Sequence, residues 1–274
     1  MIELPEAVCL AKQFNQAVAG KRVERVLPPT KPHSFCWFNG DAVEYHAKLA
    51  GRVLEGAEGF GMFVELAFDG GQRLCIDDGV NPRFVQAGKL PKDFQLAAVF
   101  CDGTALAFTV AMYGGIYLHE GGYQNEYYVK SRQAVSPLCA DFDGRFYAAL
   151  SSAKQTLSMK AFLATQQRFP GIGNGVAQDI LFNAGLHPKR KIATLSEEGA
   201  AALLKSVKST LKEMTELGGR DTEKDIFANP GGYATKMSKN TVSRGCPACG
   251  GAITKEAYLG GSVYYCPRCQ PLDA

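Results

Sequence analysis

Residues 171–188 read Gly-Ile-Gly-Asn-Gly-Val-Ala-Gln-Asp-Ile-Leu-Phe-Asn-Ala-Gly-Leu-His-Pro, the most informative stretch of this sequence. Three glycines within five residues predict a tight turn at 171–175. A short helix is expected over 176–184, where Gly185 can close it. Glycines allow a close backbone approach and the N–H groups at a helix start bind anions, so the turn at 171–175 suits an anion. Taken alone, the same residues also fit an ordinary glycine-rich turn.

The C-terminal end carries two cysteine pairs, Cys246-Pro-Ala-Cys249 and Cys266-Pro-Arg-Cys269, with sixteen residues between them. Two Cys-x-x-Cys turns at this spacing can supply four thiolates to one tetrahedral ion. The intervening segment suits a β-hairpin too short to bury its own core, so the metal would supply the stability. We expect one structural Zn²⁺; redox-active or unliganded cysteines are the alternative. The remaining cysteines read as free thiols of a reducing compartment: Cys9, Cys36, Cys75, Cys101 and Cys139.

The first 130 residues combine one helix with many short strands. Pro5 suits a first helical turn and the apolar spacing that follows predicts a helix over 5–19. Short apolar runs separated by Gly, Asp and Asn then predict a β-sandwich or flattened barrel. The expected strands include 42–45, 62–66, 96–100 and 106–109, and the expected hairpin turns are 69–71 and 102–103.

From about residue 141 the pattern becomes helical. Phe146, Leu150, Phe162 and Leu163 fit amphipathic helices. Ser196 is expected to cap a further helix that ends at 218–219. Residues 221–245 are polar and basic and contain glycine, so they are predicted to form a linker or a mobile loop.

Composition excludes several classes of protein. The chain has 274 residues, of which 46% are hydrophobic and 21% charged, so it is neither disordered nor collagen-like. No apolar run approaches the roughly 20 residues that span a bilayer, and the acidic start lacks a signal peptide's basic region. We expect a soluble cytoplasmic protein without membrane contact.

Charge is unevenly distributed along the chain. Residues 1–150 carry 14 Lys+Arg and 17 Asp+Glu, a net of −3, whereas residues 151–274 carry 16 and 10, a net of +6. A basic C-terminal half suits a nucleic-acid partner, although a solvated basic surface would give the same balance.

Three features occur in order along the chain: Glu3-Leu4-Pro5-Glu6, the turn at 171–175 with Leu186-His187-Pro188, and the four-cysteine finger. This combination resembles the formamidopyrimidine-DNA glycosylase / endonuclease VIII family over essentially the whole chain. The resemblance implies an α+β multidomain fold. Its parts are an N-terminal helix plus β-sandwich (1–130), a helical helix–two-turn–helix domain (131–235) and a C-terminal zinc-finger β-hairpin (236–274).

The resemblance also implies a partner and a set of functional residues. Duplex DNA would lie bent between the domains with a damaged nucleotide everted. Glu3 matches the catalytic carboxylate and Glu6 the second carboxylate of the motif, while Lys160 and Asn174 match phosphate-binding positions. The zinc ligands would be Cys246, Cys249, Cys266 and Cys269. Without the resemblance, Glu3 would read as a capping or packing carboxylate and Lys160 as a solvated helix charge.

The N-terminus departs from the family pattern. The family nucleophile is an N-terminal proline amine, whereas residue 2 here is Ile2. A secondary amine forms the iminium that permits strand cleavage. Ile2 would offer only a primary amine, and only after loss of Met1, which we expect to stay because its removal requires a small second residue.

Other family positions are also changed. The family's catalytic lysine aligns with Gly61, and its void-filling Arg-Phe pair and Met align near Tyr113, Gly114 and Val80. The phosphate-binding arginine of the zinc hairpin aligns with Gly261. His46, Lys48 and the pair His119-Glu120 are weak candidates for a replacement nucleophile or base. Cys36-Trp37 reads as core packing, and five tyrosines could stack on a base or belong to the sandwich core: Tyr113, Tyr117, Tyr123, Tyr127 and Tyr128.

These observations predict a monomeric DNA-repair protein of the bacterial cytoplasm, located with the nucleoid. The leading hypothesis is a DNA glycosylase of base excision repair with altered chemistry. Glu3 would activate water against C1′, and lyase activity through a proline imine would be reduced or absent. The alternatives are a catalytically silent binder of damaged or bent DNA, and a zinc and helical module for protein contacts or RNA.

Overall fold

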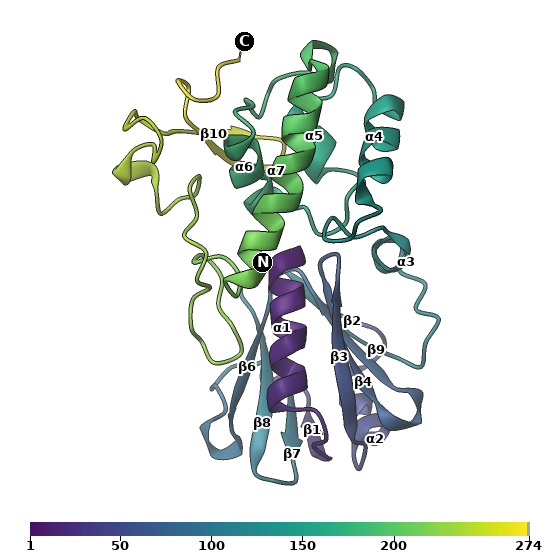
Figure 1. Cartoon of the computed structure of the whole chain (residues 1–274). Coiled ribbons are helices and arrows are strands. Elements are labelled where there is room, and N and C mark those ends of the chain that lie inside the picture. Colours follow the sequence, from purple (N-terminus) through teal and green to yellow (C-terminus); the bar gives the residue numbers. More distant parts are fainter. Residues whose placement is uncertain (273–274) are drawn as a thin grey trace.

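Two β-sheets face each other in the half of the molecule that contains the N-terminus (Figure 1). The computed structural model describes residues 1–272. Apolar side chains from both sheets fill the space between them, among them Leu66, Ile76, Leu106 and Phe108. The larger sheet has the order β2 (Cys36–Phe38), β9 (Gly114–His119), β5 (Arg73–Asp77), β4 (Phe63–Phe68), β3 (Leu54–Phe60). The smaller has the order β1 (Val23–Leu27), β7 (Leu96–Phe100), β8 (Thr104–Val110), β6 (Val80–Gln86).

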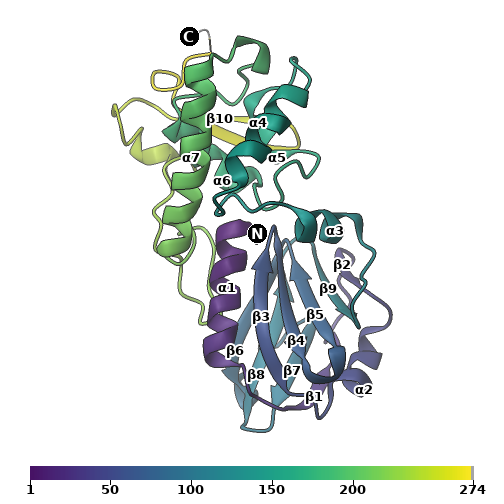
Figure 2. The same cartoon turned by 45° about the vertical axis from the view of Figure 1, so that its right-hand side comes forward.

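Helix α1 (Leu4–Ala17) lies along the side of the sandwich between the two sheets, and its N-terminal end reaches the helical half (Figures 1 and 2). The Glu6 side chain accepts a hydrogen bond from the Glu3 N–H at 3.2 Å, which satisfies one N–H at the helix start. Phe14 packs into the sandwich core, whereas Leu4 belongs to the core of the helical half. This helix therefore joins the two halves.

Most of the strands expected from the sequence are confirmed, but the strand over 42–45 is wrong. The segment forms a 3-10 turn (Ala42–Glu44) followed by α2 (Tyr45–Leu49). The Asp41 carboxylate accepts a hydrogen bond from the Val43 N–H at 2.9 Å, which caps a helical turn. Local capping therefore outweighs the β-branched and aromatic composition of the segment. Further 3-10 turns occupy Asp69–Gly71, Ala87–Lys89, Ile192–Thr194 and Val242–Arg244.

The helical half follows α3 (Glu126–Gln133), which connects it to the sandwich (Figure 2). It contains α4 (Phe142–Ser152), α5 (Met159–Ala164), α6 (Asn174–Asn183) and α7 (Glu197–Glu216). Its core includes four aromatic rings packed edge to face or stacked: Phe142, Phe146, Phe162 and Phe169. Ser196 caps α7 as expected, because its hydroxyl accepts a hydrogen bond from the Gly199 N–H at 3.1 Å.

The segment after α7 is not the linker or mobile loop expected over 221–245. It returns to both halves of the molecule and is anchored by buried side chains. Ile226 lies in the sandwich core and Tyr233 in the helical core. The Ile226 carbonyl accepts a hydrogen bond from the Phe84 N–H at 2.7 Å. The polar composition of the segment does not predict this packing, because its few apolar residues are isolated in the sequence.

The C-terminal hairpin pairs β10 (Thr254–Tyr258) with β11 (Gly261–Tyr265). It is held against α6 by a hydrogen bond of 2.6 Å from the Tyr264 N–H to the Gln178 side chain. The predicted fold class is confirmed. The structure has a β-sandwich with an N-terminal helix, a helical domain and a four-cysteine hairpin. Among the helices in residues 1–272, none combines the length and apolar character needed to cross a bilayer.

Candidate functional site

Glu3 connects the start of α1 to the start of α6. Its Oε1 accepts a hydrogen bond from the Gly175 N–H at 2.8 Å, and its Oε2 accepts one from the Val176 N–H at 2.7 Å. These N–H groups lie in the first turn of α6, where helical bonding leaves donors free and the dipole favours an anion. The side chain is only 1% exposed. A single carboxylate thus fixes the glycine turn of the helical half against the sandwich half.

The glycines of the turn at 171–175 are required by this contact. A Cβ on Gly173 would lie 2.7 Å from Glu3 Oε1, and one on Gly175 would lie 1.6 Å from an Arg220 nitrogen. Gly171 has φ +89° and lies against the carbonyl oxygen of Gly61. The glycine spacing therefore reflects the close packing of Glu3 and Arg220 as well as the tightness of the turn.

Arg220 is the residue of this site that sequence reasoning missed. Its Nε and Nη2 donate to the two oxygens of Glu6 at 2.9 and 2.7 Å, and Nη1 lies 3.5 Å from Glu3 Oε2. Burial raises the pKa of Glu6, but the charge and hydrogen bonds of Arg220 outweigh it and hold that pKa below its ordinary value. The signal available in the sequence was an arginine directly after Gly218-Gly219, which alone does not indicate a partner.

Lys160 and Asn174 both contact the zinc-finger hairpin. Lys160 Nζ donates to the Tyr258 carbonyl at 2.5 Å, and burial lowers its pKa. Asn174 Nδ2 donates to the Ser262 carbonyl at 3.1 Å, while its Oδ1 is buried and has no partner among residues 1–272. The structure thus brings the two predicted phosphate contacts together beneath the hairpin. Their contact with phosphate stays a prediction.

A cavity of about 210 Å³ opens where these parts meet. The N-terminus contributes Met1 and Glu3, the glycine turn contributes Asn174, and the hairpin contributes Ser262. Lys239, from the segment after α7, adds a cationic side chain. All three parts of the predicted DNA-binding scaffold therefore contribute to one concave surface.

Ile2 does not face this cavity. Its side chain is 3% exposed and belongs to the sandwich core. Its N–H donates to the Asp78 carbonyl at 2.5 Å. The nitrogen of residue 2 is therefore engaged in a backbone hydrogen bond.

The other positions singled out in the sequence have varied surroundings. Gly61 has φ +55°, and a Cβ there would meet Ser131 Oγ at 2.6 Å, so a side chain is excluded. Val80 is buried. Gly261 lies beside Asn174, with 3.5 Å between its Cβ position and the carboxamide.

The weak candidates for replacement chemistry are separated from the site. His46 lies on α2 with Lys48, and its Nδ1 accepts a hydrogen bond from the Val26 N–H. His119 is buried beside Glu65, with 3.4 Å between His119 Nε2 and Glu65 Oε2. The expectation that Trp37 packs in the core is wrong, since it is 49% exposed.

The four finger cysteines form one cluster, in which all sulfur atoms lie within 4.8 Å of one another. Cys246 and Cys269 are 3.7 Å apart at sulfur, and Cys249 and Cys266 are 3.5 Å apart. Tetrahedral zinc with Zn–S bonds of about 2.3 Å requires sulfur atoms roughly 3.8 Å apart. The donor set and spacing therefore fit a structural zinc ion.

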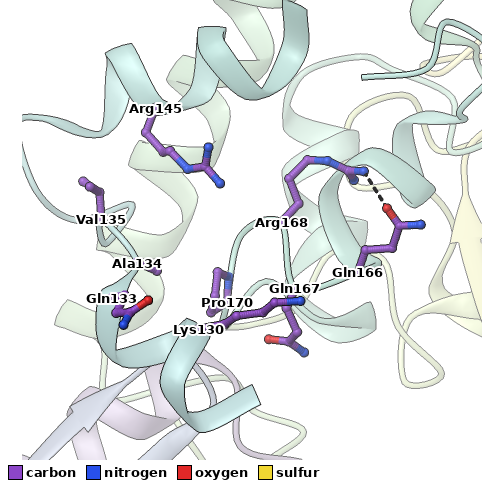
Figure 3. A pocket seen from close by; sticks show the side chains of 9 residues that line it. All are labelled: Lys130, Gln133, Ala134, Val135, Arg145, Gln166, Gln167, Arg168 and Pro170. Carbon is purple, nitrogen blue, oxygen red and sulfur yellow. Dashed lines mark hydrogen bonds between the residues drawn. The ribbon is translucent and has the colours of Figure 1, made fainter. Parts of the chain in front are cut away.

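A cationic cavity of about 460 Å³ lies between α3, α4 and the loop before Gly171. Lys130, Arg145 and Arg168 line it from these three elements, and Figure 3 shows the Arg168 guanidinium turned toward Gln166. Arg168 also donates to Gln166 Oε1 at 3.1 Å. Three cations around one concavity favour an anion such as phosphate.

Comparison with known proteins extends these observations to the whole chain. Residues 134–225 match the formamidopyrimidine-DNA glycosylase H2TH domain. A formamidopyrimidine-DNA glycosylase of Thermus thermophilus is 28% identical over 280 residues, covering 98% of this chain and 98% of that protein. One from Geobacter metallireducens is 29% identical, covering 98% of this chain and all of that protein.

Solved structures agree in fold. The crystal structure of the MutM (Fpg) protein of Thermus thermophilus superposes with a TM-score of 0.79 at 25% identity, covering 98% of both chains. The Lactococcus lactis Fpg in complex with DNA containing an abasic site gives 0.84 at 19% identity, covering 98% of this chain and 99% of that one.

The sandwich, the glycine turn held by Glu3 and the four-cysteine hairpin occur together with a region of the helix–two-turn–helix class. Full-length similarity narrows this class further. Over nearly its whole length the chain is similar to formamidopyrimidine-DNA glycosylases, and its residues 134–225 match the H2TH domain of those proteins.

Proposed function

We propose that this protein binds duplex DNA carrying a damaged base in the groove between its two halves and releases that base by hydrolysis. The observation that carries the proposal is the Glu3 carboxylate bound to the first N–H groups of α6. This contact assembles the N-terminus, the glycine turn and the zinc hairpin around one cavity. The full-length relatives, which are named formamidopyrimidine-DNA glycosylases, support the same reaction class.

Binding would rest on phosphate contacts from the helical half. Asn174 and Lys239 line the cavity beside Glu3, and Lys160 lies behind the hairpin. Lys160 would exchange the Tyr258 carbonyl for a phosphate oxygen as the hairpin settles on the duplex. One structural zinc ion held by the four cysteines would keep the hairpin folded. The protein would act as a monomer in the cytoplasm, with the nucleoid.

The chemistry would differ from a proline-imine reaction. The nitrogen of Ile2 is hydrogen-bonded and its side chain is buried, which opposes attack by that atom. Each Glu3 oxygen accepts one backbone hydrogen bond, and Oε2 also lies 3.5 Å from Arg220 Nη1, so Oε1 is the oxygen with a lone pair to offer. A water in the cavity could donate to that lone pair and attack C1′, which releases the base without an imine. Strand cleavage would then be reduced or absent.

A silent binder of damaged or bent DNA is the second candidate. The observation that favours it is the low exposure of Glu3, which is 1%, together with its engagement by two N–H groups and Arg220. A carboxylate committed to holding two domains together has little freedom to accept a proton. The scaffold would then recognise DNA without reacting.

A base-release and strand-nicking assay separates the two candidates. Purified protein is mixed with duplexes that carry abasic, oxidised, ring-opened or alkylated sites, and borohydride is added to trap any imine. Base release without trapping, lost in Glu3→Gln, is the expected result. A trapped adduct would contradict the hydrolytic mechanism, and mass spectrometry would locate the amine. Tight binding without release would support the silent binder.

Glu3→Gln needs a structural control because Glu3 also holds the domains together. Glu6→Gln weakens the same interdomain contact through Arg220 but leaves the Glu3 carboxylate in place. If both variants lose base release in parallel with thermal stability, the role of Glu3 is structural. If only Glu3→Gln loses release, the carboxylate takes part in the reaction.

A further inference from the structure

A third cavity lies on the sandwich half and is larger than the cavity beside Glu3, from which it is separate. Its volume is about 600 Å³, within the range of small-molecule sites. Asp77 and Asp78 lie in its wall, together with Trp37, Tyr113 and Tyr127. We call it the Asp77 cavity. No Lys, Arg or His is present among the residues in 1–272 that line it.

The Asp77 carboxylate is held in place by neutral donors. Asp77 Oδ1 accepts a hydrogen bond from the Gly115 N–H at 2.6 Å, and the Tyr117 hydroxyl also bonds to this carboxylate. Gly115 is required here, since a Cβ would lie 2.0 Å from the Tyr117 hydroxyl. Burial and the charge of Asp78 raise the pKa of Asp77 to about 7. The wall therefore becomes fully negative only above about pH 7, and no cationic side chain within residues 1–272 lines it.

Asp78 is held at the rim in an uncommon backbone conformation. Its φ is +49°, in the left-handed region that non-glycine residues seldom adopt. Its carbonyl accepts the Ile2 N–H, so the turn is tied to the N-terminus. The N-terminal amine pairs with Glu223, and its positive charge also acts on the Asp78 carboxylate, although burial still raises the pKa of Asp78 to about 6. Strained residues of this kind cluster at functional sites.

Aromatic rings complete the wall. Trp37 is 49% exposed and Tyr127 is 54% exposed, so both present ring faces to solvent or to an occupant. Tyr113 donates its hydroxyl to the Met1 sulfur at 3.2 Å, which places it between this cavity and the N-terminus. Aromatic faces beside carboxylates attract flat cations through ring quadrupoles and direct charge. Phosphate would be repelled.

The cationic cavity of Figure 3 adjoins the Asp77 cavity through Gln167, which lines both. Gln167 Oε1 is buried and has no hydrogen-bond partner among residues 1–272, so an acceptor is available at the junction. One cavity therefore suits a positively charged ring and its neighbour suits a phosphate. A nucleotide carries both groups.

We infer that the Asp77 cavity binds a cationic, alkylated purine base everted from DNA, stacked on Trp37 and Tyr127 with its charge facing Asp77 and Asp78. The inference deepens the proposed function and rests on it, because it names the class of damaged base. A cationic base leaves as a neutral molecule when the glycosidic electron pair returns to the ring nitrogen. The water oxygen then bonds to C1′ and its proton passes to a carboxylate, so neither a proline amine nor protonation of the base is needed.

Trp37 is the sole tryptophan of the chain, so its fluorescence reports occupancy of this cavity directly. The probes are 1-methyladenosine, a cation, and its neutral isomer N6-methyladenosine, compared slightly above pH 7, where Asp77 is mostly ionised and 1-methyladenosine stays cationic. We expect saturable quenching with about tenfold tighter binding of the cation. Equal binding of the two isomers, or none of either, would overturn the inference.

Matched variants locate the effect. Asp77→Asn keeps an oxygen acceptor for the Gly115 N–H and should abolish the preference for the cation. Tyr127→Ala should weaken both probes. Asp93→Asn removes an exposed carboxylate paired with Lys31 and should change neither. If both Asp77→Asn and Asp78→Asn still bind the cation more tightly than its neutral isomer, the assignment of the cation to this cavity is contradicted.

Duplex binding distinguishes this inference from the proposed function. If the protein binds and processes damaged duplex but Trp37 does not discriminate the isomers, the inference fails alone. If it neither binds duplex nor releases any base, the proposed function fails whatever the fluorescence shows.

Discussion

Arg220 and Glu6 form a bidentate ion pair between the segment after α7 and the first turn of α1, with distances of 2.9 and 2.7 Å. The arginine is 3% exposed and the glutamate 6%. Arg220 also lies 3.5 Å from Glu3 and donates to the Met1 carbonyl at 3.2 Å. The pair therefore fixes the geometry of the N-terminus, on which the proposed site depends.

Replacing Arg220 with Met should lower the free energy of unfolding by about 3–5 kcal/mol, because Glu6 is left buried without its partner. Denaturant titration measures this. Arg25→Met, which removes an exposed arginine paired with Glu24, should cost less than about 1 kcal/mol. Equal losses in the two variants would show that the buried pair is not important for stability.

Gly175→Ala should disrupt the junction between the halves, since its Cβ would lie 1.6 Å from an Arg220 nitrogen and 3.0 Å from Glu3 Oε1. We expect a clear fall in melting temperature and weaker duplex binding. Gly144→Ala on α4 is the matched control, with nothing within 4 Å of the added Cβ. It should stabilise the protein by up to about 1 kcal/mol. If Gly175→Ala left the melting temperature and duplex binding unchanged, the turn would be free to shift.

Removal of zinc should unfold the hairpin and reduce affinity for duplex DNA. Either chelation or Cys266→Ser, at a buried cysteine of the cluster, should cause both losses. Circular dichroism measures the loss of hairpin structure, and filter binding measures the loss of affinity. Cys101→Ser and Cys139→Ser change exposed cysteines outside the cluster and should have no effect. Normal duplex binding by the chelated protein would exclude the hairpin from the DNA surface.

Salt dependence separates the two predicted phosphate contacts. Lys160→Ala should weaken duplex binding at every sequence and reduce the slope of log affinity against log salt by about one. Asn174→Ala should also weaken binding but leave the slope unchanged, because its side chain is neutral. Lys31→Ala, on an exposed pair with Asp93, is the control. An unchanged affinity in both test variants would refute the proposed DNA contacts.

Acid should destabilise the attachment of α3 to the sandwich. Burial raises the pKa of Glu65, but hydrogen bonds from His119 and Tyr128 and the charge of Arg132 outweigh it and lower the pKa to about 2. The ordinary value is 4.5, so this stabilisation is present above pH 4.5 and is lost as the pH falls towards 2.

Denaturation at several pH values tests this assignment. Glu65→Gln should be less stable than the unmodified protein near neutrality, and the difference should shrink in acid. Glu24→Gln, at an exposed position, should show no such convergence. A stability difference for Glu65→Gln that is independent of pH would contradict the assigned charge interactions.

Local chemistry in the sequence was sufficient for the main elements. Cysteine spacing predicts the hairpin and its metal cluster, and glycine spacing with a following apolar helix predicts the turn before α6. Pro5 and Glu6 predict the start of α1. Each of these signals arises from neighbours within a few residues, where backbone sterics and capping dominate.

The sequence by itself determined the order of the elements, the four-cysteine hairpin and the turn that receives Glu3. Only the tertiary structure decided that Arg220 pairs with Glu6, 214 residues away, that Ile2 is buried, and that Asp77 lies beside Trp37 in one cavity. The physical reason is that burial and ion pairing depend on contacts between distant segments. Spacing along the chain carries no information about which distant partner will remove a charge from water.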